Sequence, residues 1–369
     1  MSIIIHKYLI SGGGTGGHIF PAISIANALK QIDPHCEVLF IGAEGHMEME
    51  RVPAAGYNIE GLKVEGLDRQ HLLRNVKVIC NLLSSLPKAR RIIKNFKPDV
   101  AVGVGGYASA AALLVAKSMN IPIVLQEQNG FAGVANKLLA KKAEKICVAY
   151  SGMERFFPAD KIILTGNPIR QNLFNPDLDK NEAYAAFGFK NNIPTLLVMG
   201  GSLGAMTINN GMIKGLKQFA QAGVQVIWQT GKRYFADAKK AFDENPCSNV
   251  LVTDFISRMD YAYAIADVVV ARAGASTISE LTFLGKPAIL IPSPNVAEDH
   301  QTHNAMALAN QNAAICLPDK EAEEKLAPLA INLLLDDERK SSIAENSKKM
   351  AQNDSALRIA NEIVKLCKN

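Results

Sequence analysis

A short apolar segment followed by a glycine-rich loop and a helical pattern occurs twice in this chain. The first copy runs from Lys7–Ile10 into Gly12–Gly17, and the second runs from Pro194–Met199 into Gly200–Ala205. A buried strand, a glycine loop and a helix together begin a βαβ unit on a parallel sheet. The repetition therefore predicts two α/β domains of related construction.

Alternating apolar strands and helical patterns continue after each glycine loop. Further strands are expected at residues 38–41, 100–104, 122–125, 224–228, 249–252, 267–271 and 287–291, with helices at 108–119, from 203 and from 275. From about Glu321 to Lys368 the apolar spacing is helical throughout. The length of 369 residues fits two domains of ordinary size.

A cluster of turn-forming residues divides the two halves. It comprises Thr165–Arg170 and contains Gly166, Asn167 and Pro168. We place the first domain at residues 1–165 and the second at 166–351. We also expect a last helix, at about 352–369, to pack back onto the first domain.

The composition excludes several classes of protein. The net charge of +5 is small, and no run of like charges or basic–aromatic alternation indicates a nucleic-acid partner. Six scattered cysteines form neither a zinc-binding pattern nor a disulfide framework. His6 and Lys7 interrupt the amino-terminal apolar stretch, and no apolar run approaches the roughly 20 residues of a membrane span. We expect a protein of the reducing cytosol.

The first glycine loop leads directly into His18 at a helix start. Backbone N–H groups and the helix dipole favour a phosphate or sugar at such a loop. A P-loop would need Lys and Ser or Thr where His18 and Ile19 stand. A dinucleotide-binding motif would need an acid for the ribose, and Glu44 follows Gly17 too late to serve. The helix start disfavours the imidazolium form, so His18 is the candidate general base.

The second glycine loop admits two interpretations. Gly200–Gly204 matches the nucleophile elbow of α/β-hydrolases, with Ser202 as the nucleophile. Asp254 or Glu280 with His300 or His303 would then complete a triad. That interpretation leaves the first loop unexplained, whereas a second anion site explains both.

A third helix start follows the strand at 267–271. Small and hydroxyl residues in Ala273–Ser279 place backbone N–H groups where a diphosphate can bind. Glu280 lies about two turns into this helix, where a carboxylate can accept hydrogen bonds from ribose hydroxyls. His300 and His303 share a helix face, but no third ligand accompanies them, so we expect no metal site.

These motifs together resemble the glycosyltransferases of the GT-B fold, and specifically the MurG-type N-acetylglucosaminyltransferase family of peptidoglycan synthesis. The resemblance extends over essentially the whole chain and rests on segments 13–21, 105–107, 127–129, 166–170, 200–202, 272–280 and 300–301. It implies an α/β GT-B fold, in which two Rossmann-like domains carry parallel sheets that face each other across a cleft.

The resemblance also implies a donor site for UDP-N-acetylglucosamine, mainly on the second domain. Phe255 and Ile256 border the uracil, Glu280 binds the ribose, and Arg170 and Ser202 hold the diphosphate. The helix start at 275–279 also holds the diphosphate. Asn129 and Gln301 contact the transferred sugar, and the first glycine loop closes over this sugar. The complete expected set is Thr15, Gly16, Gly17, Asn129, Arg170, Ser202, Phe255, Ile256, Ala275, Ser276, Thr277, Ile278, Ser279, Glu280 and Gln301. His300 departs from a glutamine found in some relatives.

The implied acceptor is undecaprenyl-diphospho-N-acetylmuramoyl-pentapeptide, at the cytoplasmic face of the bacterial inner membrane. The implied reaction inverts the anomeric carbon, with His18 as base and neither cofactor nor metal. Segment 72–91 mixes apolar residues with cations, which fits a peripheral contact with anionic lipid. An ordinary helix pair, with one face on the core and the other in solvent, fits this segment nearly as well. Two rival functions remain, a UDP-N-acetylglucosamine 2-epimerase and a UDP-sugar sensor without catalysis.

Overall fold

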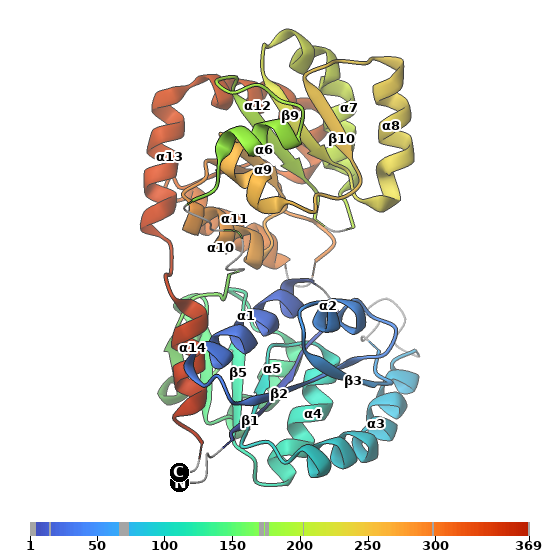
Figure 1. Cartoon of the computed structure of the whole chain (residues 1–369), viewed down its shortest axis with the longest axis vertical. Helices are drawn as coiled ribbons and strands as arrows, with labels where there is room; N and C mark the ends of the chain where they lie inside the picture. Colours follow the sequence, from blue (N-terminus) through green and yellow to red (C-terminus); the bar gives the residue numbers. More distant parts are fainter. Residues whose placement is uncertain are drawn as a thin grey trace. The chain divides into compact units, whose positions relative to one another are not determined.

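The computed structural model describes residues 5–14, 16–65, 74–169, 173, 177–201, 203–296 and 299–367, with backbone alone at 74–77 and 79. The chain forms two compact units (Figure 1). Unit 1 comprises Met1–Ile169 and Gln352–Asn369, and unit 2 comprises Arg170–Ala351.

Unit 1 is built on a seven-stranded parallel sheet in the order β3-β2-β1-β4-β5-β6-β7. Its strands are β1 (Lys7–Ser11), β2 (Glu37–Ala43), β3 (Asn58–Leu62), β4 (Val100–Gly103), β5 (Ile123–Glu127), β6 (Lys145–Val148) and β7 (Ile162–Leu164). In the central strand β1, Tyr8, Leu9 and Ile10 are all fully buried. Continuous apolar strands of this kind are typical of a parallel sheet that is covered on both faces.

Helices cover both faces of the sheet in unit 1. They are α1 (Gly16–Ile32), α2 (Glu48–Ala54), α3 (Arg74–Phe96), α4 (Tyr107–Ser118), α5 (Val134–Leu139) and α14 (Ser355–Val364), with short 3-10 helices at Ala140–Lys142, Met153–Arg155 and Ala159–Lys161. Leu9 points into the core beneath α3 and α4, whereas Tyr8 and Ile10 point into the core beneath α1 and α14. Segments from opposite ends of the sequence, α1 and α14, thus share one core (Figure 1).

Unit 2 contains a six-stranded parallel sheet in the order β10-β9-β8-β11-β12-β13. Its strands are β8 (Thr195–Met199), β9 (Gln225–Gln229), β10 (Val250–Thr253), β11 (Val268–Ala271), β12 (Ala288–Leu290) and β13 (Ile315–Cys316). Its helices are α6 (Lys180–Ala186), α7 (Met206–Gln221), α8 (Phe235–Glu244), α9 (Met259–Ile265), α10 (Ala275–Leu284), α11 (His300–Ala309), α12 (Ala322–Leu335) and α13 (Asp337–Lys349), with 3-10 helices η5 (Lys232–Tyr234) and η7 (Asp319–Glu321). Helices α7 and α12 cover one face, and α9, α10 and α11 cover the other.

The same hydrogen-bonded ring closes the start of the central strand in both units. In unit 1, the backbone N–H of Lys7 donates to Asp99 Oδ2, and the N–H of Asp99 donates to the carbonyl of Lys7, each at 2.8 Å. In unit 2, Thr195 and Asp267 make the same two hydrogen bonds, again at 2.8 Å. This shared feature, together with the matching strand order, confirms the prediction of two Rossmann-like α/β domains.

The structure corrects three details of the expected elements. Helix α7 begins at Met206 and not at residue 203, because Gly204 has a φ of +78° and the chain must first complete a turn. Segment 74–96 is one long helix, α3, and not the helix pair that was the alternative interpretation of this segment. Four strands, β3, β6, β7 and β13, were not expected, and each is short or lies towards a sheet edge.

Candidate functional site

The first glycine loop lies at the carboxyl end of β1, where the strand order reverses direction and α/β proteins bind their ligands. It packs directly on the loop that follows β4. A Cβ atom on Gly12 would lie 2.0 Å from Val104 Cγ2, and one on Gly106 would lie 2.6 Å from the carbonyl oxygen of Gly13. The glycines at 12 and 106 are therefore required by the contact between the two loops.

A buried carboxylate, Glu48, holds this loop from the other side. Its Oε1 accepts hydrogen bonds from the N–H of Ala43 at 3.0 Å and of Gly14 at 3.2 Å, and its Oε2 lies 3.1 Å from the Gly14 nitrogen. Glu48 is 0% exposed. The N–H of Gly14 is thus directed at a carboxylate within the protein, and not towards the phosphate or sugar for which the sequence predicts a site at this loop.

His18 lies in the first turn of α1 and is half-buried. Its Nδ1 is 3.1 Å from the carbonyl oxygen of Gly13. A carbonyl oxygen can only accept, so in the neutral ring Nδ1 carries the proton and Nε2 carries the lone pair. A Cβ atom on Gly105 would lie 2.8 Å from Nε2, so a side chain at 105 would press on this nitrogen.

Asn129 is oriented by a second buried carboxylate, Glu127, at the end of β5. Glu127 Oε1 accepts from the backbone N–H of Asn129 at 3.2 Å and from its side-chain amide at 3.4 Å. Glu127 Oε2 accepts from the N–H of Gly133 and from Asn136 Nδ2, each at 2.9 Å. The sequence pointed to Asn129 as a contact, and the structure adds the anchor that fixes its position.

The glycine loop of unit 2 follows β8 and is supported by neutral groups. Gln229 Nε2 donates to the carbonyl of Gly201 at 3.3 Å. A Cβ atom on Gly204 would lie 2.1 Å from the carbonyl oxygen of Thr230, and one on Gly231 would lie 2.4 Å from the Gly204 nitrogen. This loop therefore requires its glycines for contact with the chain after β9.

Helix α10 begins beside this loop, directly after Gly274. Its N-cap residue, Gly274, has no side chain to cap the first turn, and Ser276 Oγ is buried without a hydrogen-bond partner among the described residues. Further along the helix, Glu280 is buried and its Oε2 accepts from the hydroxyl of Tyr263 on α9 at 3.0 Å. The helix thus combines N–H groups at its start with a fixed carboxylate near its middle.

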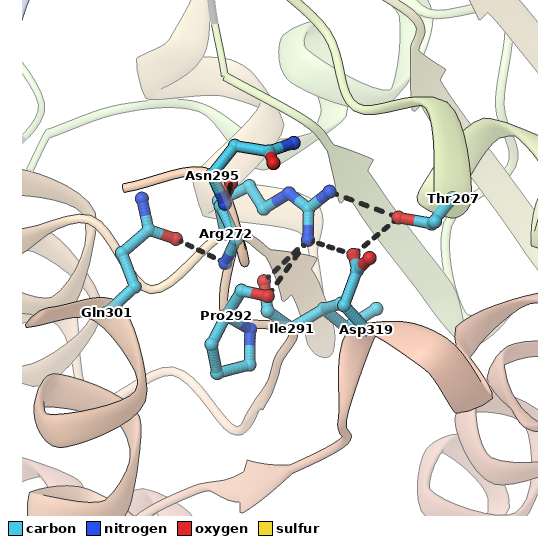
Figure 2. Close-up of polar contacts among 8 residues, drawn as sticks. Thr207, Arg272, Ile291, Pro292, Asn295, Gln301 and Asp319 are labelled. Atoms are coloured by element: carbon cyan, nitrogen blue, oxygen red, sulfur yellow. Dashed lines mark hydrogen bonds and ion pairs between the residues drawn. The ribbon is translucent and has the colours of Figure 1, made fainter. Parts of the chain in front are cut away.

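Arg272, at the end of β11, points into unit 2 (Figure 2). Its guanidinium donates to the carbonyls of Ile291 at 3.2 Å and Pro292 at 3.1 Å, to Thr207 Oγ1 at 3.0 Å and to Asp319. These partners connect the loop after β12, the start of α7 and η7. Arg272 therefore holds three segments of the site in place, and the sequence did not indicate its partners.

Gln301 and Phe255 are two of the residues expected to contact the UDP-sugar. Gln301 Oε1 accepts from the N–H of Ser293 at 2.9 Å, so the amide NH₂ of Gln301 is left to donate in another direction (Figure 2). Phe255 is 43% exposed, while its neighbour Ile256 is buried. Thr253 Oγ1 donates to the carbonyl of Phe255 at 3.0 Å and fixes this short loop.

Several expected site residues lie outside the described residues, namely Thr15, Arg170 and Ser202, together with Leu72 and Leu73 of the basic segment. Gly16 and Gly17 are described in the first turn of α1, and Ala275–Ser279 in the first turns of α10. Within the described ranges, no group of three or more His, Cys, Asp or Glu side chains could hold a metal ion.

The chain matches both halves of one glycosyltransferase family. Residues 8–148 match the glycosyltransferase family 28 N-terminal domain, and residues 195–363 match its C-terminal domain. Among curated proteins, the chain is 57% identical to the UDP-N-acetylglucosamine–N-acetylmuramyl-(pentapeptide) pyrophosphoryl-undecaprenol N-acetylglucosamine transferase of Parabacteroides distasonis. That alignment covers 98% of each chain.

Solved structures support the same fold. The crystal structure of Acinetobacter baumannii MurG has a TM-score of 0.76 and 27% identity, and the alignment covers 98% of this chain and 100% of that one. A UDP-GlcNAc 2-epimerase from Neisseria meningitidis has a TM-score of 0.69 at 15% identity, over 97% and 100% of the two chains, and shares the fold alone. The epimerase and hydrolase alternatives are therefore not favoured. The chain belongs to glycosyltransferase family 28 and, within it, to the UDP-N-acetylglucosamine–N-acetylmuramyl-(pentapeptide) pyrophosphoryl-undecaprenol N-acetylglucosamine transferases.

Proposed function

We propose that this protein transfers N-acetylglucosamine from UDP-N-acetylglucosamine to the muramoyl 4-hydroxyl of undecaprenyl-diphospho-N-acetylmuramoyl-pentapeptide. One observation carries the proposal: over 98% of its length the chain is 57% identical to a protein named for this transfer. The two units contribute different parts of the chemistry, and their described side chains support that division.

Unit 2 supplies the donor site in this proposal. The uncapped N–H groups of α10 and the buried Ser276 hydroxyl offer donors to the diphosphate, whose negative charge grows as it leaves. Glu280, held by Tyr263, accepts from the ribose hydroxyls, and exposed Phe255 borders the uracil. Gln301 donates to the sugar through its amide. Arg170 and Ser202 remain proposed diphosphate contacts.

Unit 1 supplies the general base. The muramoyl hydroxyl oxygen attacks the anomeric carbon, its proton passes to Nε2 of His18, and the bond from that carbon to the UDP oxygen breaks. Direct displacement converts an α-linked donor into a β-linked product. The carbonyl of Gly13 supports this role because its contact with Nδ1 leaves the lone pair on Nε2. Asn129, oriented by Glu127, is the proposed sugar contact from unit 1.

Helix α3 is the proposed contact with the membrane. Leu86 and Ile93 pack on the core of unit 1, whereas Arg90 and Arg91 are exposed and Leu83 is 58% exposed. An apolar side chain among cations favours attachment to anionic lipid at the bilayer surface. Searched over the described residues, the helices include none with the length and apolarity to cross a bilayer. The proposed location is therefore peripheral, at the cytoplasmic face of the inner membrane.

The transfer is tested with radiolabelled UDP-N-acetylglucosamine and a short-chain lipid-linked muramoyl-pentapeptide, with and without EDTA. We expect a β-linked lipid disaccharide at equal rates in both samples. Turnover of the donor without acceptor, with formation of a 2-epimer, would replace the proposal by an epimerase. Donor binding with no turnover in the presence of the acceptor would indicate a sensor.

Membrane attachment is tested by co-sedimentation with vesicles. We expect the protein to bind phosphatidylglycerol vesicles more strongly than phosphatidylcholine vesicles, and the R90E/R91E variant to lose this preference. The matched control is K348E/K349E on α13 of unit 2. Equal loss of binding in the control would show that overall charge, and not α3, attracts the protein to lipid.

A further inference from the structure

A carboxylate from another segment, that of Glu48, accepts a backbone hydrogen bond from the glycine loop of unit 1. Glu48 begins α2, and its side chain reaches back beneath the loop after β1. A Cβ atom on Gly13 would lie 1.9 Å from Glu48 Oε1, and one on Gly42 would lie 2.6 Å from Glu48 Cγ. Both glycines are therefore required by the volume of this one side chain.

The carboxylate and the histidine hold opposite faces of the same short segment. Glu48 accepts from the N–H of Gly14, and His18 Nδ1 contacts the carbonyl of Gly13, one residue earlier in the chain. The carbonyl carbon of Gly13 is bonded to the Gly14 nitrogen, so both groups belong to one peptide plane. Fixing the N–H of that plane fixes the direction of its C=O, because the peptide bond is planar.

We propose that Glu48 is a positioning residue for His18, acting through the peptide plane that joins Gly13 to Gly14. Its carboxylate turns the carbonyl of Gly13 towards His18 Nδ1, keeps the proton on Nδ1 and leaves Nε2 as the base. This inference rests on the proposed function of His18 but concerns a residue that touches no reacting atom. A carboxylate suits the task because it only accepts, whereas an amide would present a donor to one of the two N–H groups.

The tautomer of the His18 ring can be measured by NMR in the unaltered protein. In a sample with ¹⁵N-labelled histidine rings, with the His18 resonances assigned by their loss in H18Q, we expect the neutral ring to carry its proton on Nδ1. A proton on Nε2 would overturn the proposal. This measurement is independent of any transferase activity, so it stands even if the proposed function fails.

The effect on catalysis is tested with E48Q against V52A. Val52 is the other buried residue of α2 and packs in the apolar core of unit 1, so V52A weakens the same helix by loss of packing. For E48Q we expect kcat to fall by at least tenfold, with UDP affinity by calorimetry within twofold of the unaltered protein, and a mixture of His18 tautomers. For V52A we expect kcat within twofold.

Two results would refute the role of Glu48. Equal losses of kcat in E48Q and V52A would show that Glu48 acts only through stability. An E48Q protein with unchanged kcat and an unchanged His18 spectrum would show that it does not act on His18. An inactive unaltered protein would count against the proposed transfer, and the tautomer measurement would still decide the role of Glu48.

Discussion

The two glycine loops occupy the same place in two similar sheets, yet their surroundings differ in charge. In unit 1, the buried carboxylate of Glu48 accepts from the N–H of Gly14, whereas in unit 2 the amide of Gln229 supports the carbonyl of Gly201. A negative charge beneath a loop disfavours a diphosphate, and a neutral support permits one. This difference supports the proposed division, in which the same fold element holds a general base in one domain and binds an anion in the other.

The largest effect expected from this division is the loss of catalysis in H18A. We expect kcat to fall by about 10²–10⁴-fold, because general-base catalysis contributes this much, while UDP affinity stays unchanged. Rates of sugar transfer and calorimetry with UDP measure the two quantities. The control is H303A, since His303 is exposed on α11. If H18A lost UDP affinity as well as kcat, His18 would belong to the UDP-sugar site. That result would contradict the proposed division between a base in unit 1 and a donor site in unit 2.

A second comparison concerns the packing of the two loops. In G204A, the new Cβ would meet the Thr230 carbonyl oxygen at 2.1 Å, with φ at +78°. We expect the free energy of unfolding to fall by about 2–5 kcal/mol, from the clash and the strained backbone together. In G14A, φ is +88°, but no described atom lies within 4 Å, so strain alone should cost about 1–2 kcal/mol. Urea unfolding of both variants tests the difference, and equal losses would contradict it.

The donor site of unit 2 is tested by E280A. Loss of hydrogen bonds to a charged carboxylate costs about 1.5–3 kcal/mol, which corresponds to roughly 10–150-fold weaker UDP binding. Because the partners proposed for Glu280 are ribose hydroxyls, we expect E280A to bind UDP and 2′-deoxy-UDP equally. Calorimetry with both ligands measures this. If E280A still binds UDP more tightly than 2′-deoxy-UDP, Glu280 does not contact the ribose hydroxyls.

The smallest effect is expected for Y263F. The variant removes the hydroxyl that donates to Glu280 Oε2 at 3.0 Å. Because UDP is affected only through the position of Glu280, its affinity should fall by about two- to tenfold. Y261F on the same helix is the control, because the hydroxyl of Tyr261 pairs with Glu182 and Arg258. If Y263F weakens UDP binding as much as E280A, Glu280 acts through its place in the core and not through direct contact.

Local patterns in the sequence were sufficient to predict much of this architecture. The strand before each glycine loop, the helix from Ala275 and the helical carboxyl-terminal region are all confirmed, because each depends on residues adjacent in the chain. Partnerships across the sheet could not be predicted in this way. Glu48 lies 34 residues from Gly14, and Arg272 lies 65 residues from Thr207. Such pairs can be identified only when the order of the strands in the sheet is known, because that order brings their loops together.

One signal for Glu48 was nevertheless present in the sequence. Glu48 and Val52 are four residues apart on α2, so they share a helix face, and Val52 is buried. A carboxylate on the apolar face of a helix near a glycine loop indicates a buried acceptor for backbone N–H groups. Glu44, the acid considered for the dinucleotide motif, is by contrast exposed and pairs with Lys88 at 2.8 Å.

The position of α14 has a consequence for biosynthesis. Ile359 and Ile363 complete the core over α1, which carries His18, but α14 is translated only after the whole of unit 2. At about 5–20 residues per second, synthesis of residues 170–351 takes roughly ten to forty seconds. During that time the apolar face of α1 lacks its cover on the ribosome. Nascent unit 1 is thus a candidate client for chaperones, and its histidine-bearing helix acquires its final packing last.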